Sequence, residues 1–155
     1  MPIETTLVLI KPDAMERGLA GKIISRFEEK GLQIIGIKML KMDEKLAEKH
    51  YAAHVGKKFY QGLVKFMCSR PIIAMAIRGV EAVDVVRTLV GATNSRKAAP
   101  GTIRGDYSNS FSSNIIHASD SLENAKKELE LFFSKNEIFE HEPLLKQVLY
   151  APDEL

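Results

Sequence analysis

The chain has 155 residues, of which 45% are hydrophobic and 27% are charged, as is ordinary for one soluble globular domain. Its 22 basic and 20 acidic side chains give a net charge of +2, so nucleic acid is not expected as a primary partner, because that needs an excess of clustered basic residues. The single cysteine, Cys68, cannot form a disulfide within the chain, which favours a reducing compartment. No signal peptide and no run of ~18 apolar residues is visible. We therefore expect a cytoplasmic protein with no membrane partner.

The N-terminal part of the chain alternates between apolar runs and one amphipathic segment. Thr6–Lys11 is rich in β-forming residues and ends before Pro12, which predicts a buried strand. Gly21–Lys30 carries apolar residues on one face and is followed by Gly31 in a C-cap position, which predicts a helix. A second strand is expected over Leu32–Leu40.

The middle of the chain predicts two helices and a third strand. Asp43 precedes a polar helical stretch that reaches about His54. Apolar residues then recur at helical spacing over Phe59–Met67. Pro71 ends that helix and opens the apolar run Ile72–Ile77, which predicts a strand.

The C-terminal part predicts two more helices around a fourth strand. Ala82–Val90 has an apolar side at helical spacing, and Asn114–His117 reads as a short strand. Asp120 and Glu123 have the spacing of a capping box before a final amphipathic helix that extends to about Phe133.

The resulting element order is β-α-β-α-α-β-α-β-α. Continuous apolar strands that alternate with helices indicate one α/β layer structure. Periodicity alone leaves open whether the sheet is all parallel or of the mixed βαββαβ kind, because the helical pair before the third strand permits either.

One segment does not fit this pattern. Ala92–Ser113 has almost no apolar period and contains glycines together with separated basic residues, among them Arg96 and Arg104. A long irregular segment in a compact domain is usually functional or disordered. Its composition favours an anion-binding role.

His117 ends the fourth predicted strand and is a candidate nucleophile. A neutral imidazole has one nitrogen with a free lone pair, which can attack phosphorus when another group holds the second nitrogen. Glu128 on the following helix is a candidate for that group, and Lys11, Arg87 and Arg104 are candidate cations for phosphoryl oxygens. The alternative is a strand-end histidine whose nitrogens bond only to backbone.

Two common kinds of site are not indicated. The stretch ERGLAGKI lacks the glycine spacing and the Ser/Thr of a P-loop, and there is no G-x-G-x-x-G motif. The histidines and the cysteine also lack the spacing of a zinc set: only His50 and His54 could share a helix face, and no third ligand lies nearby in the sequence.

The segment Asn114–Asp120, NIIHASD, resembles the active-site signature N-x-x-H-[GA]-S-D of nucleoside diphosphate kinases. The resemblance extends over nearly the whole chain, in the order and at the spacing of that family. It includes IKPDA at Ile10–Ala14, RFEEKGL at Arg26–Leu32, HY at His50–Tyr51, GLVKFM at Gly62–Met67, GATN at Gly91–Asn94 and PGTIRGD at Pro100–Asp106.

This resemblance implies a single nucleoside diphosphate kinase domain over residues 1–155, with a ferredoxin-like βαββαβ mixed antiparallel sheet covered by helices. It implies a ping-pong reaction in which His117 takes the γ-phosphate of ATP or another nucleoside triphosphate and passes it to a nucleoside diphosphate, with Mg²⁺ on the phosphates. It also implies a homo-oligomer. The tail from Leu144 is about as long as in hexameric members, which favours a hexamer over a tetramer.

The resemblance further assigns roles to individual residues. It implies that Glu128 holds the second nitrogen of His117, that Ser119 supports Glu128 and that Tyr51 approaches the catalytic histidine. Asp120 matches an aspartate that acts on the metal indirectly, through water or the phosphate-bound Mg²⁺. The residues that match nucleotide ligands are Arg87, Thr93, Arg104 and His54 for the phosphates, Lys11 and Asn114 for the ribose, and Phe59 for the base. Stacking of the base on the Phe59 ring would account for broad base specificity.

The sequence departs from the family pattern at several positions. Ala14 and Ala118 stand where glycine is usual, and Lys58 and Ser95 stand where proline is usual. Loss of a proline at Ser95 is expected to loosen the loop that links subunits. Residues 111–113 also differ from the family pattern, which usually has an arginine directly before the asparagine. Any contact made by that arginine is absent from this chain.

Two hypotheses from other classes remain. The first is a non-catalytic nucleotide-binding protein on the same fold, which loss of His117, Lys11 or an arginine would have indicated; all are present. The second is nucleic-acid binding as a side activity, against which the near-neutral charge argues.

Overall fold

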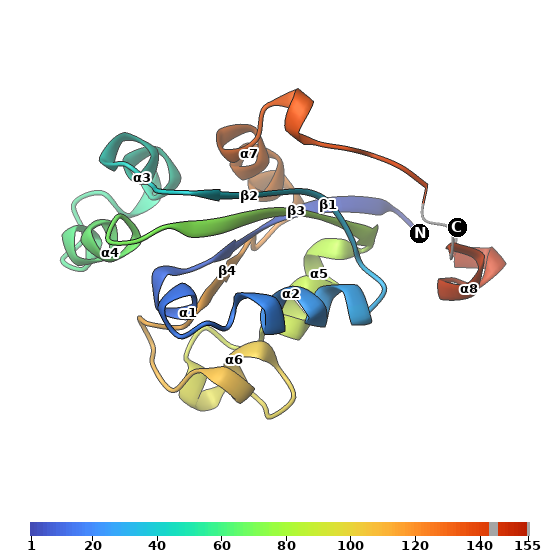
Figure 1. The fold of residues 1–155 in the computed structure, drawn as a ribbon, viewed down its shortest axis with the longest axis horizontal. Coiled ribbons are helices and arrows are strands. Elements are labelled where there is room, and N and C mark those ends of the chain that lie inside the picture. Colours follow the sequence, from blue (N-terminus) through green and yellow to red (C-terminus); the bar gives the residue numbers. More distant parts are fainter. Residues whose placement is uncertain (143–145, 155) are drawn as a thin grey trace.

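The computed structural model describes residues 1–142 and 146–154. It contains a four-stranded antiparallel sheet in the order β2-β3-β1-β4 (Figure 1). Part of the tail that favours a hexamer (residues 144, 145 and 155) lies outside the described residues. The strands are β1 (Ile3–Ile10), β2 (Gln33–Leu40), β3 (Ile72–Val80) and β4 (Ile116–Ala118). The expected ferredoxin-like arrangement is confirmed, and the all-parallel alternative is wrong.

Helices cover both faces of the sheet (Figure 1). On one face lie α2 (Ala20–Glu29) and α5 (Ala82–Val90); on the other lie α7 (Leu122–Phe132) and α3 (Glu44–His50), with α4 (Tyr60–Met67) beside α3. The remaining described elements are short: α1 (Pro12–Glu16), α6 (Ile103–Tyr107), α8 (Lys146–Leu149), and the 3-10 turns η1 (Ala52–His54), η2 (Ser95–Lys97), η3 (Lys135–Glu137) and η4 (Pro152–Glu154).

β1 is one of the two inner strands of the sheet, and its C-terminal half is buried on both faces. Its residues alternate between the two cores: Val8 and Ile10 pack on the side of α2 and α5, and Leu7 and Leu9 pack on the side of α7. All four are fully buried. This double burial explains why the strand appears in the sequence as a continuous apolar run.

Two predicted features are wrong in detail. The supposedly irregular segment 92–113 contains η2 and the five-residue helix α6, which Thr102 caps by accepting a hydrogen bond from Gly105 N at 3.0 Å. The cap of α7 is Ser121, not Asp120, because the hydroxyl of Ser121 accepts from Asn124 N at 3.2 Å. The Asp120 carboxylate accepts instead from the Asn124 side chain at 2.6 Å.

Among the helices of residues 1–142 and 146–154, none has the length and the apolar character needed to cross a membrane.

Close backbone packing around α6 makes a stability test possible. A Cβ atom at Gly105 would overlap the carbonyl oxygen of Ala99, whereas a Cβ at Gly62 in α4 would meet nothing within 4 Å. We therefore predict that Gly105→Ala lowers the free energy of unfolding by about 1–3 kcal/mol through overpacking. Gly62→Ala should raise it by about 0.5–1 kcal/mol, because alanine is the better helix former. Urea unfolding of both variants checks this, and equal stabilities would contradict it.

Candidate active site

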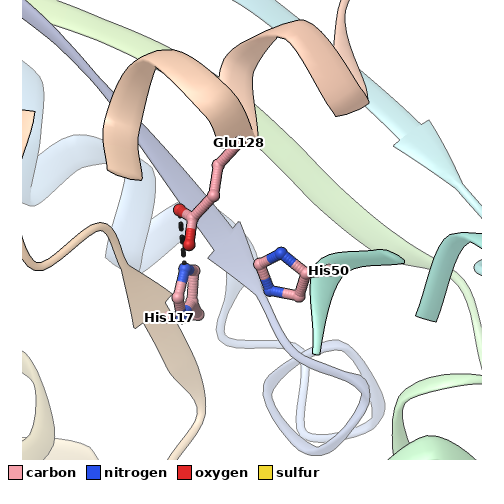
Figure 2. Close-up of side chains that lie close together, drawn as sticks. All are labelled: His50, His117 and Glu128. Atoms are coloured by element: carbon pink, nitrogen blue, oxygen red, sulfur yellow. Dashed lines mark hydrogen bonds and ion pairs between the residues drawn. The ribbon is translucent and has the colours of Figure 1, made fainter. Parts of the chain in front are cut away.

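Three side chains form a hydrogen-bonded chain between β4 and α7. His117 Nε2 lies 3.0 Å from Glu128 Oε2 (Figure 2), and the hydroxyl of Ser119 donates to the same oxygen at 2.6 Å. Ser119 is fully buried, while the side chains of His117 and Glu128 remain 25% and 18% exposed. The imidazole is thus anchored on one side and accessible to a ligand.

The charge of Glu128 decides which nitrogen of His117 carries the proton. Burial alone would raise the pKa of Glu128, but hydrogen bonds from His117 and Ser119 outweigh it and keep that pKa below its ordinary value. The carboxylate is therefore ionised at neutral pH and can only accept hydrogen bonds. Nε2 of neutral His117 must then be the donor, which leaves the lone pair of Nδ1 available for attack.

The backbone that precedes β4 is strained. Ile115 has a φ of 61°, in the left-handed region that a β-branched residue rarely adopts. Two contacts from the residues that follow β1 hold it: Ile115 N donates to Asp13 Oδ2 in α1 at 3.0 Å, and Ile115 O accepts from Lys11 N at 2.9 Å. Strain of this kind persists only where the surroundings enforce it, so Asp13 is a supporting residue that sequence reasoning did not single out.

Lys11 and Asn114 form a buried polar pair beside this strained backbone. Lys11 Nζ donates to Asn114 Oδ1 at 2.6 Å, and Asn114 Nδ2 donates to the carbonyls of Thr93 and Phe111 at 3.0 and 3.1 Å. Burial, followed by the charge of Arg104, lowers the pKa of Lys11 to about 8. The predicted sugar ligands and Thr93 therefore lie together.

The two candidate arginines are positioned by backbone carbonyls. The Arg104 guanidinium is buried and donates to Asn114 O at 3.3 Å, Gly91 O at 3.0 Å and Ile116 O at 2.7 Å. It therefore ties the segment between α5 and β4 together, and it is not a surface charge. Arg87 on α5 reaches Ala118 O at 3.5 Å, next in sequence to His117.

A line of aromatic rings leads from His117 to the protein surface. The ring centroids of His50 and His117 are 4.9 Å apart, those of His50 and Tyr51 are 4.5 Å apart, and those of Tyr51 and His54 are 6.3 Å apart. Phe59 follows at 5.3 Å from His54, and it is 53% exposed. Tyr51, His54 and Phe59, all predicted site residues, are therefore connected to the candidate nucleophile.

His50 is a site residue that the sequence did not reveal, although it stands in the quoted HY pair. Both of its ring nitrogens are buried and have no hydrogen-bond partner among the described residues. Burial, and then the nearby His117, lowers its pKa to about 3. No sequence spacing indicated its position, because its contact with His117 is made only by the fold.

Asp120 bonds to Asn124 in α7 and not to the networks described above, although the charge of Arg87 contributes to lowering its pKa. Its carboxylate is exposed at the start of α7. Its hydrogen bond from Asn124 is the main cause that lowers its pKa. It therefore presents an ionised carboxylate to solvent.

Comparison with known proteins identifies the family. A family model described as nucleoside diphosphate kinase matches residues 4–138. The nucleoside diphosphate kinase of Pyrococcus furiosus is 52% identical over 142 residues, which cover 90% of this chain and 88% of that protein. The Rhodopirellula baltica enzyme is 47% identical over 98% of this chain and 100% of its own length.

Solved structures agree with the sequence comparison. A halophilic nucleoside diphosphate kinase from Halobacterium salinarum in complex with CDP has a TM-score of 0.94 and 43% identity, covering 97% of this chain and 100% of that one. The Borrelia burgdorferi enzyme, a transition-state mimic with bound vanadate and ADP, has a TM-score of 0.89 and 38% identity, covering 94% and 96%. This chain belongs to the nucleoside diphosphate kinase family of phosphotransferases.

Proposed function

We propose that this protein is a nucleoside diphosphate kinase that carries the γ-phosphoryl group of a nucleoside triphosphate on Nδ1 of His117. The observation that carries the proposal is the Ser119–Glu128–His117 chain, because an ionised Glu128 leaves Nδ1 as the nitrogen with a free lone pair. The protein then has to supply position and charge, since the overall reaction exchanges one phosphoanhydride bond for another by way of the P–N bond of phosphohistidine.

In the first half-reaction, Nδ1 attacks the γ-phosphorus and the bond to the oxygen that bridges to the β-phosphate breaks. The nucleoside diphosphate leaves with that electron pair, and His117 becomes a phosphohistidine. The imidazole gains positive character, which the Glu128 carboxylate at Nε2 stabilises. In the second half-reaction, the terminal oxygen of another nucleoside diphosphate attacks the same phosphorus, and Nδ1 recovers its lone pair.

The charge of the phosphates requires cations near His117. We assign this role to Arg87 and Arg104, with Thr93 and His54 as further phosphate ligands. A guanidinium has five N–H donors. Arg104 donates three of them to backbone carbonyls, so two remain for hydrogen bonds to phosphate. Each charge-assisted hydrogen bond of this kind is worth roughly 1.5–3 kcal/mol.

The nucleoside is proposed to bind along the aromatic line. Phe59 exposes its ring at the outer end of that line and is assigned as the stacking surface for the base. Every base has a π-face, so stacking supports broad base specificity. Lys11 and Asn114 are assigned to the ribose hydroxyls, and Tyr51 to the approach of the phosphate toward His117.

The phosphate chemistry of the family implies a divalent metal, and we propose Mg²⁺. The donor that fits it here is Asp120, because an exposed, ionised carboxylate suits a hard cation that keeps most of its water. Asp120 is assigned an indirect role, through water or the phosphate-bound ion. When bound, Mg²⁺ neutralises charge on the phosphate oxygens.

We further propose that residues 1–155 form one kinase domain that assembles as a homohexamer, with a tetramer as the alternative, in the cytoplasm. β2 is an edge strand that exposes Ile37 and Met39 by 52% and 63%, and exposed apolar strand edges favour contacts between subunits. The lone Cys68 supports a reducing compartment.

The direct test of the mechanism is transient phosphorylation. The protein incubated with γ-labelled ATP should acquire one acid-labile, base-stable label per subunit, which any added nucleoside diphosphate removes. His117→Ala should acquire none, while His141→Ala, which changes an exposed histidine away from the site, should label as the wild type does. Label that survives in His117→Ala, or that is absent from the wild type, would contradict the mechanism.

The pKa of Lys11 predicts a pH effect on nucleotide binding. Because its pKa falls from 10.5 to about 8, the free protein holds a neutral lysine between these pH values, and the negative charge of a bound nucleotide favours the charged form. Nucleotide binding should therefore take up a proton in that range and none below it. Calorimetry in buffers of different ionisation enthalpy measures this uptake. Lys11→Met should abolish it, and Lys22→Met, at an exposed lysine of α2, should not.

The same shift affects stability in a defined direction. The unfolded chain keeps a proton on Lys11 that the folded chain loses between pH 8 and 10.5. The buried charge therefore costs stability below pH 8, and this cost decreases as the pH rises toward 10.5. We expect the free energy of unfolding to rise less steeply with pH in Lys11→Met than in the wild type. Identical slopes of this free energy against pH would contradict the prediction.

A further inference from the structure

His50, His117 and Glu128 form a cluster whose composition is that of a metal site. One ligand atom from each of the three side chains lies within 4.8 Å of the other two (Figure 2). Within residues 1–142 and 146–154 no other group of three histidine, cysteine or carboxylate side chains has this property. Each of the three comes from a different element: α3, β4 and α7.

The two nitrogens of His50 lack any hydrogen-bond partner among the described residues, although both are buried. Such groups are rare in native proteins, because an unsatisfied buried polar group costs about 1–3 kcal/mol. The edge-on contacts of His50 with His117 and Phe132 place the ring but leave its nitrogens unused. A ligand for an imidazole lone pair would remove this cost.

The distances suit a small ion after a modest movement of one ring. In a tetrahedral site with zinc–nitrogen bonds of 2.0–2.1 Å, neighbouring ligand atoms are about 3.3 Å apart. His117 Nε2 and Glu128 Oε2 are already 3.0 Å apart. The three ligand atoms lie within 4.8 Å of one another, so the ring of His50, the last residue of α3, needs to move by roughly 1–2 Å to close the set. Partial exposure of His117 and Glu128 leaves a path for the ion and for a water as fourth ligand.

We propose that His50, His117 and Glu128 bind a borderline-soft divalent ion of the Zn²⁺ type, and that this ion inhibits phosphoryl transfer. Two imidazoles and one carboxylate form a ligand set typical of zinc. Mg²⁺ prefers oxygen ligands and does not compete for this set. The site is therefore separate from the magnesium that accompanies the nucleotide.

The inhibition follows from the tautomer of His117, and this step rests on the proposed function. An ion on Nε2 takes the lone pair of that nitrogen, so the proton of the neutral ring moves to Nδ1. Nδ1 then has no lone pair with which to attack the γ-phosphorus. At the same time Glu128 exchanges its hydrogen bond from His117 for a bond to the ion.

The first test measures binding without catalysis. The metal-free full-length protein is titrated with Zn²⁺ in a calorimeter, and one ion per subunit is expected. His50→Gln should weaken binding by about 100-fold or more, because loss of a direct ligand exceeds the 10–100-fold typical of outer-shell partners. His141→Gln removes an exposed histidine and should leave the affinity unchanged. Zn²⁺ binding that is absent, or that His50→Gln does not weaken, overturns the site.

A spectroscopic measurement on the wild type guards against a His50 variant that fails to fold. Co²⁺ in place of Zn²⁺ should give the intense visible absorption of a four-coordinate nitrogen and oxygen site, and Zn²⁺ should displace it. If the spectrum shows just the weak absorption of six-coordinate Co²⁺, the proposed ligand set is overturned.

The second test concerns inhibition. With Mg²⁺ in excess, Zn²⁺ should slow the formation of phosphohistidine at the concentration at which it binds the free protein, and His50→Gln should require about 100-fold more. Phosphorylation that is unaffected at full Zn²⁺ occupancy overturns the inhibitory role. A protein that binds Zn²⁺ as expected but forms no phosphohistidine contradicts the proposed function and supports the metal site.

Discussion

The hydrogen bond between His117 Nε2 and Glu128 Oε2, 3.0 Å long, is the interaction on which the rest of the site depends. In the proposed mechanism it selects the tautomer of the imidazole, fixes the ring and provides the negative charge that a phosphorylated ring requires. Ser119 donates to the same carboxylate oxygen and so helps Glu128 remain ionised although it is partly buried. The proposed inhibition by Zn²⁺ arises from the same bond, because an ion on Nε2 reverses the tautomer that Glu128 imposes.

The surrounding fold keeps this bond in place through backbone groups. β4 is only three residues long and pairs with β1 alone. Its position therefore relies on hydrogen bonds around the segment that precedes it. The Arg104 guanidinium donates to three carbonyls, the Asp13 carboxylate accepts from the strained Ile115, and Lys11 donates to Asn114. Buried polar networks of this kind help to specify one arrangement of the chain when their members are hydrogen-bonded, and here the exception is Asp13 Oδ1, which has no hydrogen-bond partner among the described residues. The same residues can thus position the nucleophile and face the nucleotide.

The sequence predicted the order of the main elements because each helix and strand has a clear apolar period. It also predicted His117 as a nucleophile candidate and Glu128 as its partner from their places on a strand and the following helix. The mixed sheet followed only from the family resemblance, since periodicity does not report strand direction. α6 was missed because five residues with a glycine carry no helical period. The sequence does not distinguish Asp120 from Ser121 as the cap of α7, because both residue types cap helices and the two residues are adjacent.

His50 and Asp13 show a second limit of sequence reasoning. Their contacts with His117 and Ile115 join residues that are far apart in the chain. The sequence spacing of His50 pointed to His54 and not to His117, and no spacing marked Asp13 as a support. Only the packing of α3 against α7 and the pairing of β1 with β4 bring these groups together.

The central claim is that Glu128 fixes His117 with its proton on Nε2. Nitrogen-15 NMR of the metal-free protein, with His117 assigned through the His117→Ala variant, distinguishes the two ring nitrogens directly. The account predicts a protonated Nε2 and an unprotonated Nδ1 in the neutral ring, and a mixture of tautomers in Glu128→Gln. A proton on Nδ1 in the wild-type protein, or a tautomer that does not change in Glu128→Gln, would contradict it.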